Sequence, residues 1–230
     1  MRGPEEHGTV GSWIVEHAVG GAGELHHLDP PEGARRLWLL EADRPAVVLG
    51  STQRVPGIDA RTEARGLDVV RRRSGGGAVH LDPGGQLWVD VIVPRGDPQW
   101  DDDVERATWW VGEAWARLLS DAGHAGRIEV HRRGVSDREL GRAACFAAFG
   151  PGEVAVDGRK VVGISQRRTR ELARFQCVVH LRWDPEPLLA VLGAPSGGPL
   201  ERVLTERVGV AQLAGPPWWP VVEALANHLG

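Results

Sequence analysis

The chemistry of this chain centres on a single lysine. The 230 residues include 27 Lys and Arg side chains, but Lys160, in the segment GRKVVGISQRR at 158–168, is the only lysine. An ammonium group is a compact charge with three rotating donors. It can follow oxygen atoms that move during a group transfer, whereas a guanidinium fits one planar geometry. We therefore interpret Lys160 as a catalytic residue, although the arginine-rich, tyrosine-free composition is itself biased.

The second feature that could take part in chemistry is a glycine-rich loop, RRRSGGGAVHLDPGG at 71–85. Three consecutive glycines cost backbone entropy, and free N–H groups in such a turn form a concavity that binds anions. Arg71 or Arg72 could add a charge-assisted bond to a phosphate or carboxylate. The loop is not a Walker A motif, because no Gly-Lys-Ser/Thr follows. It also lacks the helix that a dinucleotide fingerprint needs after its glycines.

The two cysteines are too few for a disulfide framework, which favours a reducing compartment. Cys145 precedes Lys160 by 15 residues. Its thiol could serve as a nucleophile or as a small buried side chain. Cys177 alternates with apolar residues on a predicted strand, which favours packing. We expect no metal site, because the acidic triplet at 101–103 is typical of a helix cap and no histidine spacing indicates zinc.

Short apolar runs bounded by Gly, Pro and Asp predict the strands that must position these residues. The main runs lie at 37–40, 46–50, 67–72, 85–94, 154–156, 159–162 and 173–184. The dipeptide Asp157-Gly158 predicts a two-residue hairpin that pairs Ala155 with Lys160. On that register, one face of the sheet carries Glu153, Ala155, Lys160 and Val162, and the opposite face carries Val154, Val156 and Val161.

Helices are predicted at 58–66, from the acidic triplet to about Gly123, at 185–193 and at 219–230. The second of these has an apolar stripe of Ala107, Val111, Ala114, Trp115 and Leu118. The expected fold class is α+β, with a mixed, largely antiparallel sheet flanked by helices. We expect a single domain over 1–230, with 193–199 as a linker to a short C-terminal helical segment and no separate accessory domain.

Composition excludes several classes of protein. Hydrophobic residues form 42% and charged residues 25% of the chain, as in ordinary globular proteins. The formal net charge of -4 argues against a nucleic-acid partner. The sequence contains neither an apolar run long enough to cross a bilayer nor a recognisable signal peptide, so we expect no membrane association and a cytoplasmic location.

The string Arg-Arg-Xaa-Ser-Gly-Gly-Gly-Ala-Val at 71–79 resembles the signature loop of the lipoate-protein ligase A family, which is related to biotin-protein ligases and octanoyltransferases. Two other segments agree with this resemblance. RPAVVLGSTQ at 44–53 is similar to a family strand that ends in a Gly-Xaa-Xaa-Gln turn near the acyl pocket, and 156–168 is similar to the family's Gly-Arg-Lys-Ile-Xaa-Gly-Ser-Ala-Gln-Arg-Arg segment. The resemblance implies a biotin/lipoate-ligase-like catalytic domain.

The resemblance further implies an enzyme that attaches a lipoyl or related medium-chain acyl group to a lysine of a carrier domain through an acyl-adenylate. ATP and Mg²⁺ would be co-substrates, lipoate or octanoate would supply the acyl group, and no tightly bound cofactor would be needed. Lys160 would hold the carboxylate and the α-phosphate. The ligand-binding residues implied are Arg71, Arg72, Ser74, Gly75, Gly76, Gly77, Ala78, Val79, His80, Gly163, Ser165 and Gln166.

Two alternatives remain open. One is an octanoyltransferase that takes its acyl group from acyl carrier protein and uses Cys145 as nucleophile; the other is a non-catalytic module that binds acyl groups or nucleotides. Departures from the family pattern lie at 80–85, at Ile164 and at 176–178. The partners implied are lipoyl carrier domains of 2-oxoacid dehydrogenase complexes or the H protein of glycine cleavage.

Overall fold

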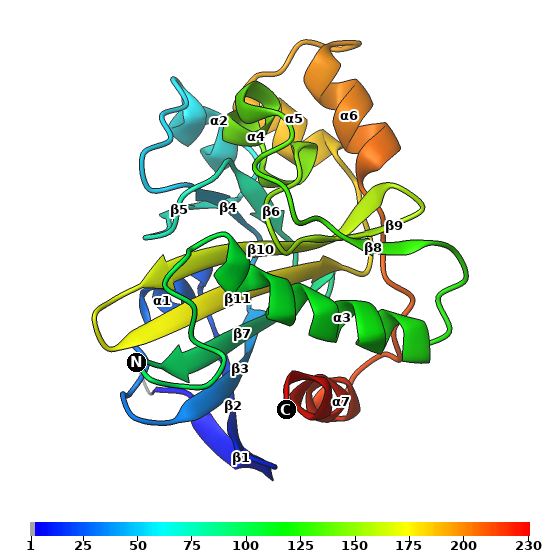
Figure 1. Ribbon diagram of the computed structural model, residues 1–230. Coiled ribbons are helices and arrows are strands. Elements are labelled where there is room, and N and C mark those ends of the chain that lie inside the picture. The colour runs from blue at the N-terminus through cyan, green and yellow to red at the C-terminus, as the bar shows by residue number, and fades with distance from the viewer. Residues whose placement is uncertain (1–2) are drawn as a thin grey trace.

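The computed structural model describes residues 3–230 and contains two sheets (Figure 1). The strands of the main sheet are β1 (Glu5–Val10), β2 (Trp13–Gly20), β3 (Arg35–Ala42), β7 (Gln86–Pro94), β8 (Ile128–Val130), β9 (Val154–Val156), β10 (Arg159–Arg168) and β11 (Leu172–His180). They lie in the order β1-β2-β3-β7-β11-β10-β9-β8, and among the described strands of this sheet only the β2–β3 pair is parallel. The small sheet has the order β5-β4-β6, with β4 (Ala46–Leu49), β5 (Asp68–Arg71) and β6 (Val79–Leu81). A mixed, largely antiparallel sheet is thus confirmed.

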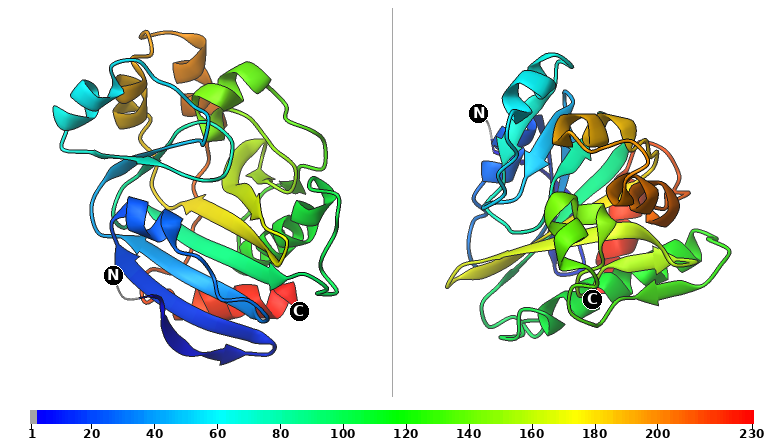
Figure 2. Two further views of the ribbon diagram at one scale, coloured as in Figure 1. Left: turned by 90° about the vertical axis from the view of Figure 1, so that its left-hand side faces the viewer. Right: turned by 90° about the horizontal axis from the view of Figure 1, so that it is seen from above.

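Helices cover both sides of the main sheet. They are α1 (Ala22–His27), α2 (Ile58–Glu63), α3 (Trp109–Asp121), α4 (Arg138–Ala143), α5 (Glu186–Leu192), α6 (Pro199–Arg207) and α7 (Trp219–Leu229), together with the 3₁₀ turns η1 (Arg106–Thr108) and η2 (Cys145–Ala147). Helices α3 and α7 lie against one face. The small sheet, with α2, α4, α5 and α6 around it, lies on the other side, as the perpendicular views confirm (Figure 2).

The first core fills the space between the main sheet and the α3–α7 pair. All five residues of the predicted apolar stripe are buried there, which confirms the amphipathic helix. The acidic triplet caps the turn before it: the Asp103 carboxylate accepts hydrogen bonds from the N–H groups of Glu105 and Arg106 at 2.9 and 3.1 Å. Cys177 is also fully buried in this core and burial raises the pKa of its thiol, so the packing interpretation is confirmed.

The second core lies between the opposite face of the main sheet and the small sheet. Trp38, Leu40 and Trp88 of the main sheet face Val48 and Leu81 of the small sheet. Helix α1 closes one end of this layer. Sequence patterns predict no element before residue 37, because β1 is polar and largely exposed and α1 is a single short helix.

The hairpin between β9 and β10 has the predicted register. Lys160 pairs with Ala155, and the turn residues Asp157 and Gly158 have φ angles of 50° and 75°. A bulge follows, however, because the next pair joins Val162 to Val154. Val162 therefore packs in the first core, and the prediction that it shares a face with Lys160 is wrong.

The predicted helices at 185–193 and 219–230 correspond to α5 and α7. Residues 193–198 form the connection between α5 and α6, and α7 packs into the first core. None of the helices between residues 3 and 230 has the length and apolar character needed to cross a bilayer.

Candidate active site

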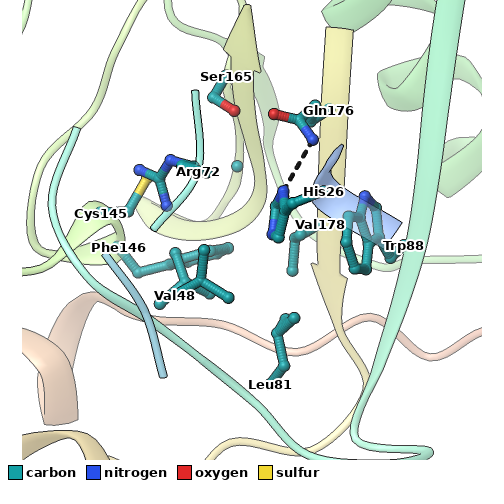
Figure 3. A pocket seen from close by; sticks show the side chains of 12 residues that line it. His26, Val48, Arg72, Leu81, Trp88, Cys145, Phe146, Ser165, Gln176 and Val178 are labelled. Atoms are coloured by element: carbon teal, nitrogen blue, oxygen red, sulfur yellow. Dashed lines mark hydrogen bonds between the residues drawn. The ribbon is translucent and has the colours of Figure 1, made fainter. Parts of the chain in front are cut away.

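A small pocket, called the inner pocket below, lies between the main sheet and the small sheet (Figure 3). Its volume is about 30 Å³. Apolar and polar side chains occupy different parts of its wall. The residues that line it are His26, Val48, Arg72, Val79, Leu81, Trp88, Cys145, Phe146, Gly163, Ser165, Gln176 and Val178.

A larger space of about 580 Å³, called the outer cavity, lies between the glycine loop, the edge of β10 and the segment that follows α4. Its lining includes Gly75, Gly76, Lys160, Gln166 and Arg168. Cys145 and Ser165 line both spaces. The Cys145 side chain therefore lies at the junction of the inner pocket and the outer cavity.

Cys145 is fixed by its backbone at the start of η2. Its N–H donates to the carbonyl of Ala78 at 3.0 Å, and the N–H of Ala78 donates to the carbonyl of Ala143 at 3.1 Å. The Gln53 side chain, from the predicted Gly-Xaa-Xaa-Gln turn, also donates to Ala143 at 2.9 Å. Three segments that are distant in the sequence thus hold the thiol in place.

Gly76 and Gly77 of the loop are required by backbone conformation and close approaches. Gly76 has a φ of +97°, and a Cβ on it would lie 2.8 Å from a guanidinium nitrogen of Arg72. A Cβ on Gly77 would lie 2.6 Å from the carbonyl oxygen of Gly141. Within residues 3–230 the N–H groups of Gly75 and Gly76 donate to no acceptor, and both residues line the outer cavity. Free N–H groups of this kind can bind an anion.

The two candidate arginines have different positions. Arg72 is buried, lines the inner pocket and donates to the carbonyls of Gly75 and Gly77 at 2.8 and 2.9 Å. No carboxylate of the described chain pairs with it. Arg71 is exposed and donates to Gly50 at 2.9 Å, outside both spaces. The structure therefore brings Arg72 to the site and leaves Arg71 outside it.

Lys160 is almost fully buried, and its charge is already paired. Its Nζ lies 2.5 Å from the Glu153 carboxylate and donates to the carbonyls of Cys145 and Ala148, both at 2.8 Å. It also lies 4.8 Å from the centre of the Phe146 ring. These three acceptors account for the three N–H donors of the ammonium group.

Glu153 is itself held by the backbone. Its carboxylate accepts hydrogen bonds from the N–H groups of Gly150 at 2.6 Å and Ile164 at 3.0 Å. Sequence reasoning placed Glu153 on the face of Lys160 without giving it a role, and the hairpin register was the signal that could have identified it.

A buried polar network supports the wall of the inner pocket. Gln176 accepts a hydrogen bond from Ser74 at 3.1 Å, and its amide nitrogen lies 3.0 Å from Nδ1 of His26. Behind it, the buried Asp90 and Arg174 form an ion pair at 2.5 Å. Burial raises the pKa of Asp90 in spite of the opposing charge of Arg174.

The remaining predicted residues fall into three groups. Val79, Gly163 and Ser165 line the inner pocket, and Gln166 lines the outer cavity. Ser74, Gly77 and Ala78 are buried behind these surfaces. His80 lies elsewhere, beside a separate cavity that it shares with His180.

Sequence reasoning missed His26, Phe146 and Trp88. His26 belongs to a helix that the sequence did not predict, and the two aromatic residues read as ordinary core positions. In the part of the chain that the structure describes, no three His, Cys, Asp or Glu side chains are arranged to hold a metal ion.

The fold and these motifs define a known class of catalytic domain. The chain belongs to the lipoyl protein ligase A/B catalytic domain family, whose model matches residues 24–210. This family comprises catalytic domains of the ligase and transferase type.

Octanoyltransferase LipM of Kyrpidia tusciae is 33% identical over 186 residues, which cover 76% of this chain and 66% of the relative. LipM of Moorella thermoacetica is 30% identical over 164 residues, which cover 70% and 59%. The matched part thus spans about three fifths to two thirds of the length of these relatives.

Solved structures show the same fold. Lipoate-protein ligase A bound with ATP has a TM-score of 0.65 at 17% identity, and the match covers 96% of this chain and 83% of that one. The bipartite lipoate protein ligase of Thermoplasma acidophilum has a TM-score of 0.65 at 16% identity, with 94% and 79% covered.

Proposed function

We propose that this chain is an acyltransferase that carries its acyl group as a thioester on Cys145 and passes it to a lysine of a lipoyl carrier domain. The observation that carries the proposal is the position of the Cys145 thiol, at the junction of the inner pocket and the outer cavity. A covalent carrier must face both its bound acyl chain and the incoming acceptor, and Cys145 has that position.

The reaction balances without a further reactant. The Cys145 thiolate attacks the carbonyl carbon of a donor thioester, and the C–S bond to the donor breaks, releasing the donor thiol. The acceptor lysine then attacks the acyl-Cys145 carbonyl, an amide bond forms as the C–S bond to Cys145 breaks, and the proton lost by the amine returns to the sulfur. Gly75 and Gly76 line the outer cavity, and their N–H groups, which have no acceptor within residues 3–230, would be the donors to the negative oxygen that develops in each step.

The environment of Lys160 favours a thioester donor over a free acid. A ligase would need the lysine charge to bind a free carboxylate, but Glu153 already neutralises that charge inside the protein. In the transferase, Lys160 acts by holding the Cys145 carbonyl.

A ligase that proceeds through an acyl-adenylate is the second candidate. The outer cavity has the size of a small-molecule site, and Gln166 and Arg168 offer donors to phosphate oxygens. A lipoate-protein ligase of the same fold has been solved with ATP. On this account ATP and Mg²⁺ enter as co-substrates together with lipoate or octanoate.

For partners, we propose an acyl carrier protein as donor and a lipoyl domain of a 2-oxoacid dehydrogenase complex, or the H protein of glycine cleavage, as acceptor. The Thermoplasma acidophilum ligase has been studied with its E2 lipoyl domain, and the curated relatives are named octanoyltransferases. We place the reaction in the cytoplasm, where Cys145 and Cys177, both free thiols, stay reduced.

The test measures acyl transfer from an acyl-carrier thioester to a lipoyl domain in the absence of ATP. We expect transfer by the unmodified chain and none by Cys145→Ser or Lys160→Met. Transfer from free lipoate that requires ATP and survives Cys145→Ser would instead support the ligase. Ligand binding without either reaction would identify the chain as a non-catalytic module.

A further inference from the structure

Another cavity, called the arginine cavity below, lies where the ends of α4 and α5 approach the loop before α2 (Figure 1). Its volume is about 760 Å³, within the range of roughly 300–1,000 Å³ that small-molecule sites occupy. Among the described residues its only charged lining side chains are Arg54 and Arg142, and no carboxylate lines it. Much of the remaining wall is apolar and includes Val55, Leu192 and Leu200.

A hydrogen bond holds the two arginines beside the same cavity. The Gln53 side chain donates to the carbonyl of Ala143 at 2.9 Å, and these two residues directly adjoin Arg54 and Arg142 in the sequence. Arg71 fixes the same loop, because its guanidinium donates to the backbone carbonyl of Gln53 at 2.5 Å. Both lining arginines therefore extend from backbone that is held in place.

The two guanidinium groups have no counter-charge in the chain. Exposed arginines elsewhere, such as Arg44, Arg73 and Arg106, pair with a carboxylate at 2.6, 2.6 and 2.9 Å. Arg54 and Arg142 are also exposed, but within residues 3–230 neither forms an ion pair or donates a hydrogen bond. A cleft lined by charges of one sign concentrates ions of the opposite sign. The arginine cavity is thus suited to an anionic group, although the whole chain has a net charge of -4.

The arginine cavity adjoins Cys145 through the glycine loop. Gly76 lines both this cavity and the outer cavity. It lies next to the thiol, since a Cβ on Gly76 would be 3.9 Å from the Cys145 sulfur. A long ligand with one end at Cys145 can therefore pass over Gly76 and place its other end between the two arginines.

We propose that the arginine cavity binds the phosphate of a 4′-phosphopantetheine arm, and that Arg54 and Arg142 thereby select the thioester donor. The inference rests on the proposed function in taking the ligand to be the donor's arm. Such an arm has its sulfur at one end and its phosphate at the other, with amide groups and an apolar dimethyl segment between them. Guanidinium groups form charge-assisted hydrogen bonds with phosphate oxygens, and the apolar wall suits the dimethyl segment. Coenzyme A and an acyl carrier protein both present this arm.

Binding to the Cys145→Ala protein tests the proposal without requiring any transfer. The two probes are octanoyl amides of pantetheine and of 4′-phosphopantetheine, in which nitrogen replaces the thioester sulfur. They differ only in the phosphate, and calorimetry gives each Kd. We expect the phosphate-bearing probe to bind about tenfold more tightly, because two unpaired guanidinium groups gain an anionic partner.

The double variant Arg54→Gln/Arg142→Gln should reduce this preference to within about twofold. The matched control is Arg133→Gln/Arg159→Gln, which loses the same charge at two exposed arginines that do not line the cavity. The control should keep the full preference. Equal binding of the two probes, an undiminished preference in the first double variant, or the same loss in the control would each overturn the proposal.

Octanoyl thioesters identify the source of the arm and separate this inference from the proposed function. The donors are octanoyl-pantetheine, octanoyl-coenzyme A and octanoyl acyl carrier protein, and mass spectrometry gives the rate at which each acylates Cys145. The rate with a phosphate-bearing donor, divided by that with octanoyl-pantetheine, should fall about tenfold in Arg54→Gln/Arg142→Gln. The phosphate-bearing donor with the larger ratio in the unmodified chain is the preferred source.

The two accounts fail in different ways. Phosphate-dependent binding that requires Arg54 and Arg142, without acylation of Cys145 by any donor, would support the anion site and remove the transferase. Acylation of Cys145 at equal rates by all three donors, with equal binding of the two amides, would support the transferase and overturn the arginine site.

Discussion

Lys160 and Glu153 form a buried ion pair next to Cys145. Both side chains are nearly inaccessible to solvent, at 1% and 3%. The sequence identified the lysine by its singularity and placed Glu153 on the same face through the hairpin register. It did not predict that the charge would be neutralised, because strand alternation gives the direction of a side chain but neither its depth nor its partner.

Removing the carboxylate should be costly in both stability and activity. In Glu153→Gln we expect the free energy of unfolding, measured with urea, to fall by about 3–5 kcal/mol, because an unpaired ammonium stays buried. Acyl transfer should fall by roughly 100-fold or more as the hold on the Cys145 carbonyl loosens. The double variant Glu153→Gln/Lys160→Met is the control: it should regain stability but not activity. A double variant no more stable than Glu153→Gln would contradict the buried-pair account.

His180 predicts a pH dependence of stability. It is buried between Phe146 and Trp183, and burial lowers its pKa to about 3. The unfolded state, with an ordinary value of about 6.5, binds the proton first as pH falls. The contribution of His180 to the free energy of unfolding is therefore fully present above pH ~6.5. It is lost as the pH falls from that value to about 3, at a limiting rate of about 1.4 kcal/mol per pH unit.

The comparison of His180→Phe with the unmodified chain measures this effect. Below pH ~6.5 the free energy of unfolding should fall less steeply in the variant, by about 1 kcal/mol per pH unit. Part of the slope should remain because burial also lowers the pKa of His26. Identical slopes in chemical unfolding experiments at pH 5 and 7 would show that His180 is not held neutral.

At the scale of elements, the hairpin shows how far sequence patterns reach. Asp157-Gly158 correctly predicted the turn and the pairing of Lys160, since two residues with positive φ select one connection. The bulge after Lys160 was not predictable, because Val161 and Val162 are both apolar and either could face the core. The bulge turns Gly163 toward the inner pocket, where a Cβ on this residue would lie 2.9 Å from the Phe146 ring.

The glycine loop packs against α4, and two glycines of this loop provide matched variants. In Gly77→Ala the new methyl group would lie 2.6 Å from the Gly141 carbonyl, so α4 and the following Cys145 must shift. We expect a loss of roughly 1–3 kcal/mol in the free energy of unfolding. Gly75→Ala meets nothing within 4 Å and should change stability by less than about 0.5 kcal/mol. Equal losses of unfolding free energy in the two variants would contradict the close approach of Gly77 to the Gly141 carbonyl.

At the scale of the whole molecule, the site exists because two sheets and an irregular segment converge on one thiol. The main sheet supplies Trp88 and Gln176, the small sheet supplies Val48, and the segment after α4 supplies Cys145. The sequence predicted the fold class and the three motifs correctly, since periodicity and local turns carry that information. It could not predict that two separate spaces meet at Cys145, because that depends on how distant elements pack.

The most direct test of the account is the mass of the protein after incubation with an acyl thioester and no ATP. We predict an added mass equal to one acyl group, located on Cys145, removed by hydroxylamine and discharged to a lipoyl domain on mixing. Cys145→Ser should gain no such thioester. An unchanged mass, together with acyl transfer that requires ATP and persists in Cys145→Ser, would contradict the covalent mechanism.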